Sequence, residues 1–145
     1  MARIYVGCSL TLAPPAFVAE VTELKTLLRA VGHEVAEFVG TVNGTALDVY
    51  QTDIHQCVAN CDIFVAICDH PAIGLGWELG MAVEHLKKPV LAVAHTGSKV
   101  SRLPIGAADG DRNPLYRFLR YDLMAEVLPM VEDLLLEAEA RRLSI

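Results

Sequence analysis

The sequence lacks the features that mark membrane proteins and nucleic-acid-binding proteins. It has no apolar run that approaches the roughly 18 residues of a membrane span. It also has no cluster of lysines and arginines, and its net charge of −6 offers no positive surface to a nucleic-acid polymer. The first residues lead directly into a predicted strand rather than a signal peptide, so we expect a cytoplasmic protein with a small-molecule partner.

Cysteines are few, and they do not form a metal-binding pattern. There are four, and no Cys-x-x-Cys pair is present. Cys57 and Cys61 lie four positions apart on a predicted helix. Cys8 and Cys68 end predicted strands. Because structural zinc sites use closely spaced ligand pairs, we expect small, reduced, buried thiols and no metal.

Charged residues are also scarce, at 21% of the 145 residues against 53% hydrophobic residues. This balance predicts a compact, largely buried sheet rather than disorder. The length predicts one domain over residues 1–145 that buries about 68–70% of its unfolded surface. Periodicity predicts strands at residues 3–8, 34–38, 63–68, 90–94 and 116–121. It predicts helices at about 18–31, 46–60, from the glycine-rich segment 74–80 to 86, and 124–142, with a loop at 96–112.

Strands that alternate with helices predict a parallel sheet with right-handed crossovers. We expect an α/β fold that is flavodoxin-like (Rossmann-like), a doubly wound five-stranded sheet of order 2-1-3-4-5 with helices on both faces. Ligand sites in such sheets lie where the strand order reverses, here between the first and third strands. Residues 5–9 and 69–78 should therefore meet at one crevice.

Residues 74–82 carry the strongest functional signal and read Gly-Leu-Gly-Trp-Glu-Leu-Gly-Met-Ala. They follow the continuous apolar run at 63–68, which is typical of a buried parallel strand. The pattern predicts Glu78 in the first turn of a helix, where the helix dipole favours an ionised carboxylate by roughly 0.3–1 kcal/mol. Glu78 is therefore a candidate nucleophile or base, although many helices simply begin with a charged residue.

Four segments together resemble the nucleoside 2-deoxyribosyltransferase superfamily, which includes the 2'-deoxynucleoside 5'-phosphate N-hydrolases. They are Ile-Tyr-Val-Gly at 4–7, Asp53, the Glu78 segment, and Gly-Ala-Ala-Asp-Gly at 106–110. Their order and spacing match over residues 3 to about 121. The resemblance implies an enzyme that acts on a deoxyribonucleoside or deoxyribonucleotide without a cofactor.

In this superfamily a glutamate attacks the anomeric carbon of a deoxyribonucleoside, and a covalent deoxyribosyl-enzyme forms before a second base or water takes the sugar. The resemblance implies that Glu78 is the nucleophile, that the Tyr5 hydroxyl orients it, and that Asp53 contacts the substrate and assists proton transfer. Retaining glycosidases follow the same logic. Without the resemblance, Tyr5 would be interpreted as an ordinary strand aromatic and Asp53 as a solvated helix residue.

Further residues are candidates for substrate binding. Gly7, Gly74 and Gly76 would let the backbone approach the sugar or a phosphate closely. Ser9 belongs to the segment that should face the crevice. Trp77 is expected either to cover the pocket or to lie in the core.

The hydrolase branch has a serine that reaches the 5'-phosphate of a neighbouring subunit, and Ser101 matches it. The resemblance therefore implies a homodimer or a higher homo-oligomer, and segment 106–110 also favours this branch.

Six residues before the nucleophile, transferases carry an aspartate and hydrolases a serine, but this chain has Ala72. Asp69 or His70 is a candidate replacement.

The arginine that follows the first strand in the hydrolases is also missing. Lys99, Arg102 or Arg112 is a candidate replacement for its charge. On balance the sequence favours a hydrolase that uses water as the acceptor. A deoxyribosyltransferase and a catalytically inactive nucleotide-binding module remain alternatives, whereas a flavodoxin fits poorly because residues 10–17 are mostly apolar.

Overall fold

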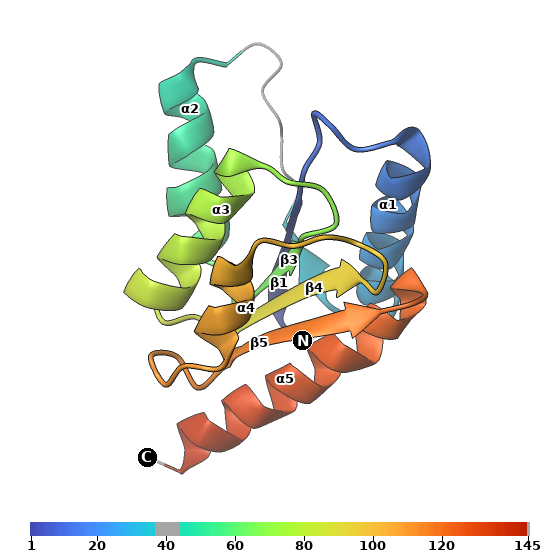
Figure 1. Cartoon of the computed structure of the whole chain (residues 1–145). Helices are drawn as coiled ribbons and strands as arrows, with labels where there is room; N and C mark the ends of the chain where they lie inside the picture. Colours follow the sequence, from blue (N-terminus) through green and yellow to red (C-terminus); the bar gives the residue numbers. More distant parts are fainter. Residues whose placement is uncertain (37–43, 145) are drawn as a thin grey trace.

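The computed structural model describes residues 1–36 and 44–144 and contains a five-stranded parallel sheet (Figure 1). The strands are β1 (Arg3–Cys8), β2 (Glu34–Val35), β3 (Ile63–Ile67), β4 (Val90–His95) and β5 (Tyr116–Tyr121). Their order β2-β1-β3-β4-β5, parallel at every pairing, confirms the predicted flavodoxin-like α/β fold. The last positions of the predicted second strand, from residue 37, lie outside the described residues.

Helices cover both faces of this sheet (Figure 1). They are α1 (Pro15–Ala30), α2 (Ala46–Tyr50), η1 (Gln51–Val58), α3 (Ile73–Gly80), η2 (Met81–His85), α4 (Arg102–Ala108), η3 (Met124–Glu126) and α5 (Val127–Leu143). α1 and α5 pack on one face, and η1, α3, η2 and α4 pack on the other. No described helix combines the length and the apolar character needed to cross a membrane.

Successive residues of the central strands point to opposite faces of the sheet and so build two separate clusters. Ile4 and Val6 of β1 pack towards α1 and α5, whereas Tyr5 packs towards α3 and η1. Every residue of β3 is buried, because this strand is covered on both faces. Its continuous apolar sequence is what a central parallel strand requires.

Two local features differ from the sequence prediction. Helix α4 lies inside the segment 96–112 that was expected to be a loop, and Ser101 caps it by accepting the N–H of Leu103 at 3.4 Å. At seven residues it is too short to show a helical period. The predicted helices at 46–60 and 74–86 exist, but each continues into a π-helical segment, η1 or η2. Such segments often occur at functional sites.

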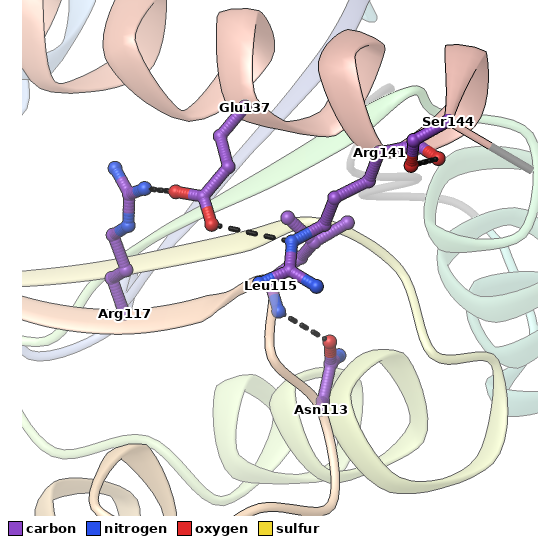
Figure 2. A network of polar contacts seen from close by, with 6 residues as sticks. All are labelled: Asn113, Leu115, Arg117, Glu137, Arg141 and Ser144. Carbon is purple, nitrogen blue, oxygen red and sulfur yellow. Dashed lines mark hydrogen bonds and ion pairs between the residues drawn. The ribbon is translucent and has the colours of Figure 1, made fainter.

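Polar contacts hold the edge strand β5 in place (Figure 2). Glu137 of α5 pairs with Arg117 of β5 and with Arg141, one turn further along its own helix, at 3.3 Å. At the start of β5, Asn113 accepts the N–H of Leu115 at 3.0 Å and donates to carbonyls of η2 and of the connection to β4. These contacts fix the start of β5 against η2 and the connection to β4, and they join β5 to α5.

The glycine in β1, Gly7, is required by packing. A Cβ atom built there would lie 2.9 Å from Cε2 of Phe64 and 3.2 Å from Cδ1 of Leu75. Phe64 is fully buried and its ring stacks on Tyr5 with centroids 5.2 Å apart, so it has no free space into which to move. The absent side chain therefore makes room for a neighbouring side chain of the core.

We expect Gly7→Ala to lower the free energy of unfolding by about 1–3 kcal/mol, because it overpacks a filled core. Gly80→Ala is the matched control: its Cβ would meet open space, and in a helix alanine is about 1 kcal/mol more favourable than glycine. Urea denaturation of both variants measures the difference. Equal stability of the two variants would contradict the packing role of Gly7.

Candidate functional site

A cavity of about 840 Å³ opens at the carboxyl ends of β1 and β3. It brings together β1, the loop that follows β1, one residue each of α1 and η1, and the start of α3. Its lining consists of Tyr5, Val6, Gly7, Cys8, Ser9, Leu10, Thr11, Leu12, Lys25, Asp53, Pro71, Ala72, Ile73, Gly74, Leu75 and Glu78. The two segments that were expected to converge therefore do line one crevice, at the predicted reversal of strand order.

Glu78 lies deeper in its helix than the sequence suggested. α3 begins at Ile73 after the extended residue Ala72, so Glu78 occupies the second turn and the first turn holds no acidic residue. The prediction that Glu78 lies in the first turn, where the helix dipole would favour its ionised form, is therefore wrong. The glycines at 74 and 76 did not delay the helix, because packing of Leu75 and Leu79 in the core outweighs their weak helix propensity.

Burial, rather than a helix dipole, controls the charge of Glu78. The residue is only 8% exposed, and Oε2 is buried without a hydrogen-bond partner in the described part of the protein. Desolvation raises the pKa of Glu78 to about 7. Hydrogen bonding with Tyr5 acts in the opposite direction and the negative charge of Asp53 adds to the increase.

Tyr5 is held rigidly beside this carboxylate. Tyr5 is 2% exposed, and its ring is nearly parallel to that of Phe64, with 13° between the two ring planes. Desolvation and the nearby charge of Glu78 raise the pKa of the Tyr5 hydroxyl far above neutrality. The phenol therefore keeps its proton and acts as a hydrogen-bond donor to Glu78.

Asp53 approaches the same cavity from the π-helical segment η1. Its Oδ1 is buried and, like the Glu78 oxygen, has no partner among the residues described. Burial raises the pKa of Asp53. His55, two positions further, is exposed and its ring bonds to the hydroxyl of Tyr50 at 3.1 Å, outside the cavity.

The other candidate residues divide between the cavity and its surroundings. Gly7, Ser9 and Gly74 line it, and Ser9 is 3% exposed. Gly76 lines a neighbouring groove instead. Trp77 is 63% exposed and belongs to neither hollow, so a core position for it is wrong and its contact with substrate stays a prediction.

Ser101 also lies outside the cavity of its own chain. It borders the neighbouring groove of about 390 Å³, between α3 and α4, together with Lys99 and Gly76. The groove shares Pro71, Ala72 and Leu75 with the cavity, so the two hollows are adjacent. Within one chain, Ser101 is therefore a helix cap beside the cavity rather than part of its lining.

Neither expected replacement at the Ala72 position is available. The carboxylate of Asp69 accepts the hydroxyl of Tyr121 at 2.6 Å and the N–H of His95 at 3.2 Å, so both oxygens are engaged in holding the sheet. His70 borders the neighbouring groove and not the cavity.

The structure reveals one basic residue that the sequence interpretation missed. Lys25 of α1 is the only cationic side chain among the described residues of the cavity lining. Lys99, Arg102 and Arg112 do not line it, and Arg112 pairs with Glu84 at 3.4 Å. One sequence signal existed: Lys25 directly follows a buried leucine of α1, at the border of its apolar face.

The described residues contain no group of histidines, cysteines or acids placed to hold a metal ion, and the four cysteines are unpaired. The side-chain groups that line the cavity are two carboxylates, one neutral phenol, one ammonium group, two hydroxyls (Ser9 and Thr11) and the thiol of Cys8.

The chain is similar to proteins whose names or structures are known. No protein-family model matches the chain. A curated relative from Syntrophotalea carbinolica, named "Putative 2'-deoxynucleoside 5'-phosphate N-hydrolase 1", is 30% identical over 125 residues, covering 79% of this chain and 82% of the relative.

Two solved structures share the fold. The CMP N-glycosidase BcmB of Clostridium botulinum superposes with a TM-score of 0.66 at 18% identity, over 90% of this chain and 98% of that one. A 2-desoxiribosyltransferase from Leishmania mexicana gives a TM-score of 0.55 at 19% identity, over 77% and 75%. Since the curated relative is 30% identical across most of both chains, this protein is an enzyme that belongs to the nucleoside 2-deoxyribosyltransferase superfamily.

Proposed function

We propose that this enzyme cleaves the N-glycosidic bond of a 2'-deoxyribonucleoside or its 5'-monophosphate, with Glu78 as the nucleophile and water as the acceptor. The observation that carries the proposal is the buried, unpartnered Oε2 of Glu78 in a cavity that also holds Tyr5 and Asp53. A buried oxygen without a hydrogen-bond partner lowers the stability of the protein, and a bound substrate would supply the missing partner. The names of the curated relative and of both solved structures support the same bond type.

In the proposed reaction, ionised Glu78 attacks the anomeric carbon while the bond to the base breaks and its electron pair leaves with the base. Asp53, whose pKa burial raises, is suited to hold the proton that the departing base requires. Tyr5 donates to Glu78 and keeps the attacking oxygen oriented. Water then hydrolyses the glycosyl ester and restores the carboxylate.

A deoxyribosyltransferase is the second candidate. It would require the acceptor base to be held in the cavity after the first base leaves. The transferases use an aspartate on the base at the position of Ala72, and Asp69 is engaged elsewhere. The chain thus offers no side chain for this task at that point, which favours water.

An assay of base release tests these possibilities. The enzyme is incubated with each 2'-deoxynucleoside, each 5'-monophosphate and CMP, with and without a second free base, and products are separated by chromatography. Base released without an acceptor supports the hydrolase. A new nucleoside formed only with the acceptor supports the transferase, and binding without any product would leave an inactive nucleotide-binding module.

We expect Glu78→Gln to lose about a thousandfold or more of the activity, because the amide is a poor nucleophile. The same variant should be more stable than the wild type at pH 8. A carboxyl pKa that rises from 4.5 to about 7 on folding destabilises the ionised state by about 3 kcal/mol. The advantage should fade as the pH falls from 7 towards 4.5, where both states become protonated. Near-wild-type turnover by Glu78→Gln would contradict the proposal that Glu78 is the nucleophile.

We expect Tyr5→Phe to shift the acidic limb of the kcat/KM profile to higher pH. The limb reports ionisation of Glu78, and the lost hydrogen bond normally lowers its pKa. Tyr116→Phe is the matched control, since this buried hydroxyl donates to the carbonyl of Pro104 at 2.6 Å. An unchanged limb in Tyr5→Phe, or an equal shift in both variants, would contradict the assignment.

We further propose that Ser101 serves the site of a neighbouring copy, because it lies outside the cavity of its own chain. Ser101→Ala should then weaken turnover of monophosphates more than that of free nucleosides, by about tenfold. Size-exclusion chromatography with light scattering would show whether a dimer exists. A monomeric, active enzyme would rule out this role.

A further inference from the structure

Lys25 is an unexplained cation in an otherwise acidic site. Its side chain reaches the cavity from α1 and is half-buried. In the described part of the chain, its ammonium group makes no hydrogen bond or ion pair. Lys25 is not among the described residues that bury an unpartnered nitrogen or oxygen, so its stem is partly covered while its ammonium group keeps access to solvent and is available to a ligand in the cavity.

The charge of Lys25 acts at the end of β1, where Cys8 lies. Burial raises the pKa of the Cys8 thiol, the charge of Lys25 lowers it, and the charges of Glu78 and Asp69 add to the increase. Lys25 does not contribute to the pKa of Glu78 or to that of Asp53. Lys25, Cys8 and Glu78 line the same cavity, and the thiol of Cys8 is affected by the positive charge of Lys25 as well as by the negative charge of Glu78.

The start of α3 makes the same cavity favourable to an anion. Ala72 is the N-cap residue and has no side chain that could cap the helix. Ile73 and Gly74, in the first turn, line the cavity. Amides at a helix start attract anions. The unpartnered oxygen of Glu78 in the same cavity is an independent sign that a ligand completes this site.

The substrate classes of the proposed reaction differ in charge. A free nucleoside carries no negative group at neutral pH, whereas a phosphate monoester carries nearly two charges and three acceptor oxygens. An ammonium group and free amides match the second class. The carboxylates must meet the sugar, so a charged group at the far end of the substrate would lie away from them.

We propose that Lys25 binds the 5'-phosphate of the substrate and makes the enzyme select nucleoside 5'-monophosphates over free nucleosides. This assignment rests on the proposed function. Lys25 then takes the role of two phosphate-binding residues of the hydrolases that this chain lacks. One is the arginine after the first strand, and the other is the serine at the position of Ala72. The selectivity is thus carried by a residue of α1 rather than by the loop before α3.

Binding measured without turnover tests this assignment. The Glu78→Gln variant is titrated calorimetrically with the four common 2'-deoxynucleoside 5'-monophosphates, CMP, the matching nucleosides and inorganic phosphate. Adding Lys25→Met should weaken monophosphate binding by about ten- to a hundredfold and leave nucleoside binding within about twofold. Adding Lys25→Arg should retain most of the monophosphate affinity. Weaker dependence on salt in Lys25→Met would accompany the loss.

Several results would overturn the assignment. Lys25→Met could lose equal affinity for nucleosides and monophosphates, or lose affinity for neither. The protein with Lys25 intact could prefer free nucleosides, or no variant could bind monophosphates. Lys99→Met could lose as much monophosphate affinity as Lys25→Met. Binding of inorganic phosphate alone, without monophosphate selectivity, would also overturn it. The base-release assay is separate: wild type that binds monophosphates through Lys25 but releases no base refutes the proposed function and retains the anion site.

Discussion

The burial of one carboxylate, that of Glu78, is the constraint on which the site depends. A carboxyl group whose pKa is raised to about 7 is held in the protein at a cost in stability. That cost is offset by the packing of α3, where Leu75 and Leu79 fasten the helix to the sheet. The helix can therefore keep an unpartnered oxygen at the wall of a cavity, which an isolated surface helix could not do.

Phe64 connects this site to the core of the sheet. Its ring stacks on Tyr5, which hydrogen-bonds to Glu78, and its edge occupies the space that a side chain at position 7 would fill. Gly7, Phe64 and Tyr5 thus form one packed row across β1 and β3 that ends at the nucleophile proposed here. A change in this row alters both stability and the orientation of the carboxylate, because close-packed interiors transmit small displacements.

The cavity holds charges of both signs. Burial raises the pKa of the carboxyl groups of Glu78 and Asp53, and Lys25 reaches the same lining from α1. This combination suits a ligand with a reacting centre at one end and a negative group at the other. In a chain with a net charge of −6, such local placement, rather than overall charge, has to provide attraction for an anion.

The sequence by itself determined the strand order and the position of the crevice, because both follow from apolar periodicity and from the rules for parallel sheets. It also identified the Glu78 segment, where the unusual residues are contiguous. Only the tertiary structure decided how deeply Glu78 is buried, that Ser101 lies outside its own cavity, and that Lys25 lies inside it. Those features depend on contacts between residues far apart in the chain, and no local pattern records them.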